Sequence, residues 1–270
     1  MKHQLIDTQI HIATGGRSFS NDGEALVLLH GSGQNHLTWV LQSRYFAYRG
    51  YQVLAPDFPG HGLSSGTPLE SIEDMADWIS NVIDTVEYKE ASLVGHSQGC
   101  LVAVECSSRY PDKIKTLSLM GGAGAIPMNP ELLSLAENSD PKAVDLMMDF
   151  AHGPSGHFGG HPVPGLYHLN TGSMLIQSKE IKDTLGVDFR ACENYTNGFE
   201  AAKKLNLPTL SILADKDRMC RLKDGQKLAD HIKGSEVHVI QNCGHMMLLE
   251  EADKTLSILK KFILEKYPAS

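Results

Sequence analysis

No run of apolar residues in this 270-residue chain is long enough to cross a membrane. The longest apolar stretches, such as residues 25–29, have the length of a single strand, whereas a spanning helix needs roughly 18 or more apolar residues. Residues 1–16 alternate polar and apolar side chains and lack the continuous apolar core of a signal peptide. These absences predict a protein that is neither exported nor inserted in a membrane.

Paired cysteines and clustered basic residues are also lacking, and each absence excludes a class of function. The five cysteines are odd in number and show no CxxC spacing, so we expect neither a disulfide framework nor a zinc knuckle, and a location in the reducing cytoplasm. The net charge is −8, without the basic cluster that nucleic-acid binding requires. The cysteines are Cys100, Cys106, Cys192, Cys220 and Cys243.

The remaining composition is typical of a compact α/β protein. Hydrophobic residues make up 41% of the chain and charged residues 21%, with 25 glycines and 12 prolines, which gives no sign of disorder. A chain of this length can bury one large core and often carries an insertion. We therefore expect one catalytic unit.

Strand and helix patterns alternate along most of the sequence. After a predicted pair of strands in the first twenty residues, the continuous apolar run at 25–29 indicates a strand of a parallel sheet covered on both faces. Ser71 and Asp74 resemble a capping box ahead of a helix. Further strands are predicted at 51–55, 91–94, 114–120, 208–214 and 236–240, and helices at 39–49, 72–86, 98–109, 226–232 and 250–265.

This alternation stops between residues 124 and 202. The segment mixes short helical patches with a loop-forming run at 152–164 that is rich in glycine, proline and histidine. Such a segment fits an insertion over the active-site face better than a core element. We predict a core of residues 1–123 and 203–270 and a cap of residues 124–202, inserted after the sixth strand.

The sequence Gly95-His96-Ser97-Gln98-Gly99 lies where a predicted strand turns into a predicted helix. At a strand–turn–helix junction a GxSxG motif indicates a catalytic serine, because the flanking glycines let the backbone turn sharply and expose the serine. Ser97 is therefore the predicted nucleophile.

A serine needs a base to remove its proton, and the base needs an acid to orient it. His245 follows the predicted strand at 236–240, in the loop Asn242-Cys243-Gly244-His245, and is the predicted base. Asp217 follows the strand at 208–214 and is the predicted acid. Asp215 remains the alternative, although its position so close to the strand suits a turn or a helix cap.

Attack on a carbonyl places negative charge on its oxygen, which backbone N–H groups stabilise. The amide of Gln98, at the start of the helix after Ser97, is one predicted donor. The amide of Ser32, in His30-Gly31-Ser32-Gly33 after an earlier strand, is the second. Only backbone groups are predicted here, so neither side chain is expected to be essential.

Taken in order, these motifs resemble the α/β-hydrolase superfamily over essentially the whole chain except the cap. The ordered set is HG after one strand, DFPGHGLS after the next, GHSQG, a DxD-type acid loop and CGH. The resemblance implies an α/β-hydrolase fold, with a mostly parallel central sheet and helices on both faces. It also implies that residues 57–62 form a structural turn that supports the oxyanion loop. Cys100 departs from the more frequent glycine at that position.

Other residues in the cap suggest weaker sites. His152, His157, His161 and His168 invite a metal hypothesis, but no cysteine or carboxylate joins them in a tight ligand pattern, so we predict no metal and no cofactor. Several methionines fall in the cap or beside Asp217 and His245, and we interpret most as core filler. The alternative is an apolar, adaptable substrate pocket formed by Met128, Met147, Met148, Met174, Met219 and Met246.

The predicted function is a serine hydrolase, a carboxylesterase, that acts on a small acyl substrate through an acyl-enzyme. The resemblance also includes hydrolases that cleave carbon–carbon bonds of ring-fission products and cofactor-free perhydrolases, and the motifs do not separate these. A ligand-binding receptor on the same fold is the alternative of another class. Serine at position 97 argues against dehalogenase and epoxide hydrolase chemistry, for which the family uses aspartate. We expect a monomer or a homodimer, with no nucleic-acid or membrane partner.

Overall fold

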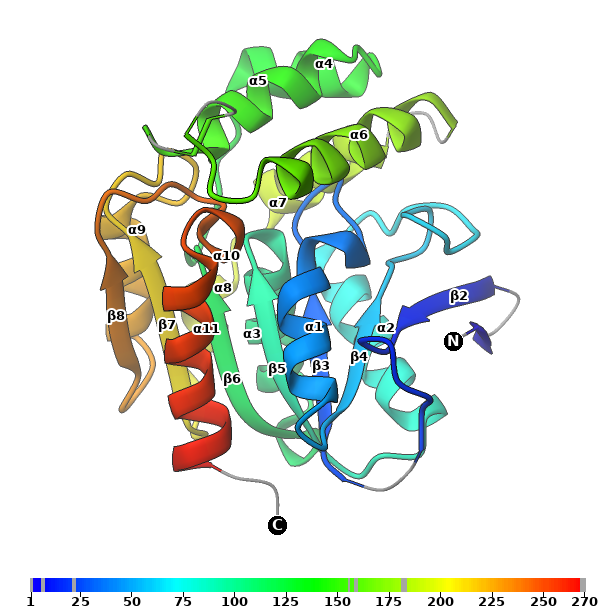
Figure 1. Cartoon of the computed structure of the whole chain (residues 1–270), viewed down its shortest axis with the longest axis vertical. Coiled ribbons are helices and arrows are strands. Elements are labelled where there is room, and N and C mark those ends of the chain that lie inside the picture. Colours follow the sequence, from blue (N-terminus) through cyan, green and yellow to red (C-terminus); the bar gives the residue numbers. More distant parts are fainter. Residues whose placement is uncertain are drawn as a thin grey trace.

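The computed structural model describes residues 2–5, 8–20, 23–154, 156–157, 160–180 and 184–267. An eight-stranded sheet with the order β1-β2-β4-β3-β5-β6-β7-β8 forms its centre (Figure 1). β1 and β2 pair antiparallel, as do β2 and β4, and all the other neighbours are parallel. The strands are β1 (Lys2–Leu5), β2 (Thr8–Ala13), β3 (Ala25–Leu29), β4 (Gln52–Pro56), β5 (Ala91–His96), β6 (Ile114–Met120), β7 (Thr209–Ala214) and β8 (Glu236–Ile240).

Helices cover both faces of this sheet and one of its ends (Figure 1). In chain order they are η1 (His36–Trp39), α1 (Val40–Ala47), α2 (Ile72–Thr85), α3 (Gln98–Arg109), η2 (Pro111–Lys113), α4 (Pro130–Glu137), α5 (Lys142–Ala151), α6 (Pro164–Glu180), α7 (Thr184–Asn194), α8 (Gly198–Lys203), α9 (Leu222–Asp230), α10 (Met247–Glu250), α11 (Ala252–Lys260) and the π-helical η3 (Lys261–Lys266). The predicted fold class is confirmed, including the insertion after the sixth strand.

The core consists of two layers, one on each face of the sheet. Along β3, Leu26 and Leu28 pack in the layer that holds α1, α10 and α11, whereas Val27 and Leu29 pack in the layer that holds α2 and α3. Alternate side chains of a strand point to opposite faces, so a strand buried on both faces is apolar throughout. This explains the uninterrupted run at 25–29.

The predicted N-terminal capping of α2 by Ser71 is confirmed. Ser71 Oγ accepts a hydrogen bond from the Asp74 N–H at 3.0 Å and donates one to Asp74 Oδ2 at 2.7 Å. The apolar side chains of the helix then face the sheet, with Ile72, Met75 and Ile79 at most 1% exposed. A capped helix with one apolar face is thereby fixed against the core.

The segment between β6 and β7 differs from its prediction in one respect. Helices α4 to α7 lie over the carboxyl end of the strands (Figure 1) and share a small apolar core of their own. Short helical patches were expected, but α6 has 17 residues. Its apolar residues are spread around the helix rather than gathered on one face, so periodicity did not reveal it, although Pro164 is well suited to a first helical position.

The predicted C-terminal helix at 250–265 is present as α11 and the π-helical η3, which together span residues 252–266, so it begins two residues later than predicted. Glu251, with φ −129° and ψ 50°, leaves the helical conformation and separates α10 from α11.

Among the residues that the structure describes, no helix has both the length and the apolar character of a membrane span.

The turn at 57–62 is organised around one buried carboxylate. Asp57 Oδ1 accepts from the His36 N–H at 2.7 Å, and Oδ2 accepts from the Leu63 N–H at 2.9 Å. His36 Nδ1 lies 2.9 Å from Asp57, and the Phe58 N–H donates to His30 Nε2 at 3.3 Å. The turn therefore contacts the loop that follows β3. Burial works against ionisation of Asp57, but the hydrogen bond and charge of His36 outweigh it and lower the pKa of Asp57.

Replacement of this carboxylate should destabilise the protein in a pH-dependent way. A carboxyl whose pKa is lowered by folding adds stability above its ordinary pKa, near 3.8, and that stability is lost as the pH falls through the lowered value. We expect Asp57→Asn to reduce the free energy of unfolding by about 1–3 kcal/mol at pH 7, with a smaller loss at pH 3. Urea denaturation over pH 3–7 measures this.

Asp112→Asn, at an exposed aspartate, is the control and should stay within about 0.5 kcal/mol of wild type. A difference between wild type and Asp57→Asn that is the same at pH 3 and pH 7 would contradict the assignment.

Candidate active site

Ser97 occupies a strained turn between β5 and α3. Its φ of 55° and ψ of −122° are unfavourable for any residue with a side chain. Two glycines permit this turn: a Cβ on Gly95 would lie 2.3 Å from the Gly99 carbonyl oxygen, and a Cβ on Gly99 would lie 2.3 Å from that of Leu29. The close approach of α3 to β3 and β5 holds Ser97 at the carboxyl end of the sheet.

His245 lies in the loop after β8 and is held by Asp217. Its Nδ1 lies 2.7 Å from Asp217 Oδ2. Asp217 Oδ1 accepts hydrogen bonds from the N–H groups of Met219 and Cys220, both at 2.8 Å. Because a carboxylate only accepts, Nδ1 carries the proton and Nε2 has its lone pair available. Nε2 is buried and has no hydrogen-bond partner within the described residues.

Asp215, the alternative acid, does not contact His245. Its Oδ1 lies 3.4 Å from the Cys243 N–H, and its other oxygen lies 3.3 Å from Lys216 Nζ. Of the two candidates, the structure brings only Asp217 to the histidine.

Ser32, Ser97 and His245 line the same small cavity, of about 20 Å³. Such a cavity holds about one water molecule. The backbone N–H groups of Ser32 and Gln98 make no hydrogen bond within the parts of the chain that the structure describes, so both remain available to an oxygen in the site. Gln98 adjoins Ser97 at the start of α3, and its side chain donates instead to the Asp188 carbonyl at 3.3 Å.

Two further histidines next to the site are held neutral. Burial, and then the proximity of His245, lowers the pKa of His96 to about 3. Burial, and then the proximity of His61, lowers the pKa of His30 to about 4. His96 Nε2 donates to the His245 carbonyl at 3.0 Å and so helps to hold His245 in place. Neither ring carries charge at neutral pH.

Methionines form much of the cavity wall. Met128, Met147, Met219 and Met246 line it together with Ile126 and Phe189. Met148 and Met174 instead pack in the core of the insertion. Some of the methionines are thus core filler and others line the cavity, which were the two alternatives that the sequence left open. The cavity wall is therefore apolar and adaptable.

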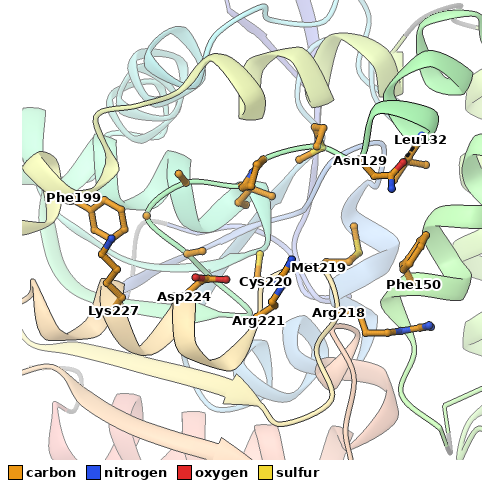
Figure 2. A pocket seen from close by; sticks show the side chains of 16 residues that line it. Asn129, Leu132, Phe150, Phe199, Arg218, Met219, Cys220, Arg221, Asp224 and Lys227 are labelled. Carbon is orange, nitrogen blue, oxygen red and sulfur yellow. Dashed lines mark hydrogen bonds between the residues drawn. The ribbon is translucent and has the colours of Figure 1, made fainter.

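A second pocket, of about 600 Å³, shares lining residues with this cavity. Figure 2 shows the side chains that line it. Ile126, Met128 and Met219 line both, so the two cavities adjoin at these side chains. Its walls are the linker after β6, parts of α4, α5 and α8, the loop after β7, and α9. The lining residues are Ala123, Gly124, Ala125, Ile126, Pro127, Met128, Asn129, Leu132, Phe150, Phe199, Arg218, Met219, Cys220, Arg221, Asp224 and Lys227.

The charged residues of this pocket are mostly cationic. Arg218 lies over the Phe150 ring and 3.8 Å from Asp149, and Lys227 lies over the Phe199 ring. The Arg221 guanidinium has no hydrogen bond or ion pair with any other residue that the structure describes. Asp224 is the one carboxylate among the lining residues. An apolar pocket with surplus positive charge suits a ligand that has a carboxylate on an apolar body.

Sequence reasoning missed two buried carboxylates that contact the loops of the site. Glu250 Oε2 accepts from the Gly153 N–H at 2.9 Å and the Gly244 N–H at 3.2 Å, and burial raises the pKa of Glu250. Asp188, on α7, accepts from the Gly33 N–H at 2.7 Å. A signal for Asp188 existed: it lies three residues after Leu185 and four before Cys192, on the apolar stripe of its helix.

The cap histidines form a ring cluster rather than a ligand set. The His152 ring lies 5.6 Å from that of His161 and 6.2 Å from that of His157. In the described residues, the one group of three side chains with ligand atoms within 4.8 Å of one another is His11, His36 and Asp57. Asp57 of that group belongs to the turn described above, where it contacts His36, and His11 lies on β2.

A family comparison agrees with this geometry. The profile of the Alpha/beta hydrolase family matches residues 26–258. The chain belongs to this family. The hydrolase is 27% identical to the 2-hydroxymuconate semialdehyde hydrolase of Pseudomonas sp. strain CF600, over 94% of this chain and 93% of that protein. It is 29% identical to a 2-hydroxy-6-oxononadienedioate/2-hydroxy-6-oxononatrienedioate hydrolase of Paraburkholderia phymatum, over 89% and 87% of the two chains.

Solved structures show the same fold for this hydrolase. A thermophilic esterase aligns with a TM-score of 0.79 at 26% identity, covering 100% of this chain and 98% of that one. The enol-lactonase of Burkholderia xenovorans LB400 aligns with a TM-score of 0.86 at 20% identity, covering 97% and 99%.

The two acid candidates can be separated by reaction with a fluorophosphonate, which labels activated serines. Asp217→Asn preserves shape, but its single oxygen can serve only one side; with that oxygen on the Met219 and Cys220 amides, an NH2 group faces His245 Nδ1 and favours the wrong tautomer, so we expect the labelling rate to fall by about 10³–10⁴-fold. Asp215→Asn should stay within about threefold of wild type, because Asp215 does not contact His245. Equal losses in the two variants would remove Asp217 from its assigned role.

Proposed function

We propose that this hydrolase cleaves a small carboxylic ester through an acyl-enzyme, with Ser97 as nucleophile, His245 as base and Asp217 as the acid that orients it. The observation that carries the proposal is the state of His245. Nδ1 is fixed by Asp217, while Nε2 has no partner among the described residues, and His245 lines the same cavity as Ser97. A histidine in this state is poised to accept a proton from a serine hydroxyl.

The chemistry follows from these positions. Ser97 Oγ attacks the acyl carbon while His245 Nε2 takes its proton, and the carbonyl oxygen becomes an oxyanion that the amides of Ser32 and Gln98 stabilise, at about 3 kcal/mol for each donor. The C–O bond to the alcohol then breaks, and His245 returns the proton to the leaving oxygen. Water, activated by His245, attacks the acyl-enzyme and releases the acid and Ser97.

The two cavities support a substrate with unequal halves. About 20 Å³ beside Ser97 admits only a small group, while the adjoining 600 Å³ admits a larger one with an apolar body. We propose that residues 124–202 act as the cap that sets this choice, since Ile126, Met128 and Met147 of that segment line the cavity. The surplus cations favour a substrate whose larger half is anionic.

Cleavage of a carbon–carbon bond is the second candidate. The support is the names of curated relatives, which include a 2-hydroxymuconate semialdehyde hydrolase and hydrolases of a dioate substrate. An acidic ketone would satisfy the same cationic pocket. Attack by Ser97 on its keto carbon would form the ester bond of an acyl-enzyme as the carbon–carbon bond breaks, and the leaving carbon would take up the proton that His245 had received from Ser97. The thermophilic esterase is 26% identical and supports the first candidate.

A substrate panel tests both proposals. It contains chromogenic esters of graded acyl length and ring-fission 1,5-diketone acids, offered to wild type and Ser97→Ala. We expect turnover of short-chain esters by wild type and a loss of about 10⁴-fold or more in Ser97→Ala. Turnover of the diketone acids alone would replace the ester with the carbon–carbon substrate. Absence of turnover on the whole panel would reject both and favour a receptor.

The charge of the larger pocket gives a separate prediction. Arg221→Ala should raise KM for a half-ester that carries a terminal carboxylate by about tenfold, because a charge-assisted hydrogen bond to an arginine contributes about 1.5–3 kcal/mol and less when exposed. The KM for a neutral ester of the same length should not change.

Lys223→Ala is the matched control, since it removes a positive charge two residues from Arg221, at the start of α9, but Lys223 does not line the pocket. A similar rise in KM for the two esters in Arg221→Ala would show that the pocket does not recognise charge.

A further inference from the structure

A buried carboxylate connects the insertion to the loop that holds Ser32. Asp188 is fully buried on α7, and its Oδ2 accepts from the Gly33 N–H at 2.7 Å. The same oxygen lies 2.9 Å from His61 Nε2, in the turn after β4. One carboxylate oxygen therefore joins three separate segments of the chain.

The partners of His61 favour the charged form of its ring. Its Nδ1 lies 3.0 Å from the Pro59 carbonyl oxygen, which can only accept, and its Nε2 faces the Asp188 carboxylate. With Asp188 ionised, both ring nitrogens donate, as they do in imidazolium. Burial opposes this charge, but the carboxylate of Asp188 outweighs it and raises the pKa of His61.

The contacts of Asp188 converge on the predicted oxyanion hole. Gly33 directly follows Ser32, and its conformation, with φ of 64°, is one that glycine favours. On the other side, the Asp188 carbonyl accepts from the Gln98 side chain at 3.3 Å. Gln177 of α6 reinforces the same loop: its amide donates to the Gly33 carbonyl at 3.1 Å and accepts from the Gly62 N–H at 2.7 Å.

A buried ion pair is a costly way to hold a fold together. Replacing such a pair with well-packed apolar residues is often neutral or stabilising. Asp188 Oδ1 also has no hydrogen-bond partner within the described residues, so the carboxylate is incompletely compensated. The effect of the Asp188 carboxylate is instead to fix the position of the Gly33 amide, next to Ser32.

We propose that Asp188 is a positioning residue of the oxyanion hole, which holds the Gly33 amide so that the Ser32 amide faces the reacting carbonyl. The proposal rests on the proposed serine-hydrolase function. It makes the insertion a structural part of the catalytic site, in addition to any role in substrate choice.

Two variants at one position separate the hydrogen bond from the charge. Asp188→Asn can keep an oxygen in the place of Oδ2, and so keep both contacts, whereas Asp188→Ala removes the acceptor. Loss of one oxyanion donor costs about 10²–10³-fold in kcat, so a displaced donor in Asp188→Ala should lower kcat by about 10–100-fold with KM within about twofold. Asp188→Asn should restore kcat to within about fivefold of wild type.

Arg190→Ala is the control, because it removes the ion pair with Glu137 from the same helix and should leave kcat unchanged. Inhibition by a trifluoromethyl ketone, which forms an oxyanion on Ser97, should weaken in Asp188→Ala by the same factor as kcat. Unchanged kcat in Asp188→Ala, or a loss in kcat that Asp188→Asn does not relieve, would overturn the proposal.

A readout without turnover keeps this test distinct from that of the proposed function. In ¹H–¹⁵N spectra, Asp188→Ala should shift the amide signals of Gly33 and Ser32, and the ¹⁵N signals of His61 should change from imidazolium to neutral. If wild type hydrolyses no ester yet these shifts occur, the function has failed while the contact stands. If wild type is active and the amide signals stay in place, the positioning role is wrong.

Discussion

The hydrogen bond between Asp217 and His245 is the contact on which the site depends, and it exists because β7 and β8 are parallel neighbours. Their carboxyl ends lie side by side, so the loops that follow them meet. β5 and β3 are parallel neighbours in the same sheet, which places Ser97 and Ser32 at the same carboxyl end of the strands. Residues more than 200 positions apart in the sequence are thereby brought to one cavity by the order of the strands.

The insertion is bound to this end of the sheet through both sides of the site. On the His245 side, the His245 N–H donates to the Ala151 carbonyl at 2.7 Å, and Glu250 accepts from Gly153. On the Ser32 side, Asp188 accepts from Gly33. These are contacts between buried groups, and breaking them would leave polar atoms without partners, at a cost of about 1–3 kcal/mol each. The insertion therefore rests on the site as a packed layer.

The sequence predicted the parts of this structure that local rules govern. The bounds of β3, α3, β6 and β8 agree with it, because strand length, apolar runs and glycine or proline stops are local. Ser97, His245 and Asp217 were placed by a motif and by strand order. Asp188 and Glu250 were not, because a sequence does not show which backbone amide a carboxylate faces, even where the apolar stripe of α7 marks Asp188 as buried. The sequence also did not predict that α6 is one long helix. Its apolar residues follow no single face, so they show no helical periodicity.

The loop after β7 joins the proposed acid, Asp217, to the larger pocket within four consecutive residues. Asp217 accepts from the Met219 and Cys220 amides, while the Met219 side chain lines both cavities and Arg218 lines the larger one. A ligand in the large pocket thus contacts the residue whose amide holds the acid. Because methionine can change rotamer at little cost, the partition between the cavities can adapt to the ligand while the backbone that fixes Asp217 stays in place. Substrate choice can therefore vary in this loop without loss of the hydrogen bond to His245.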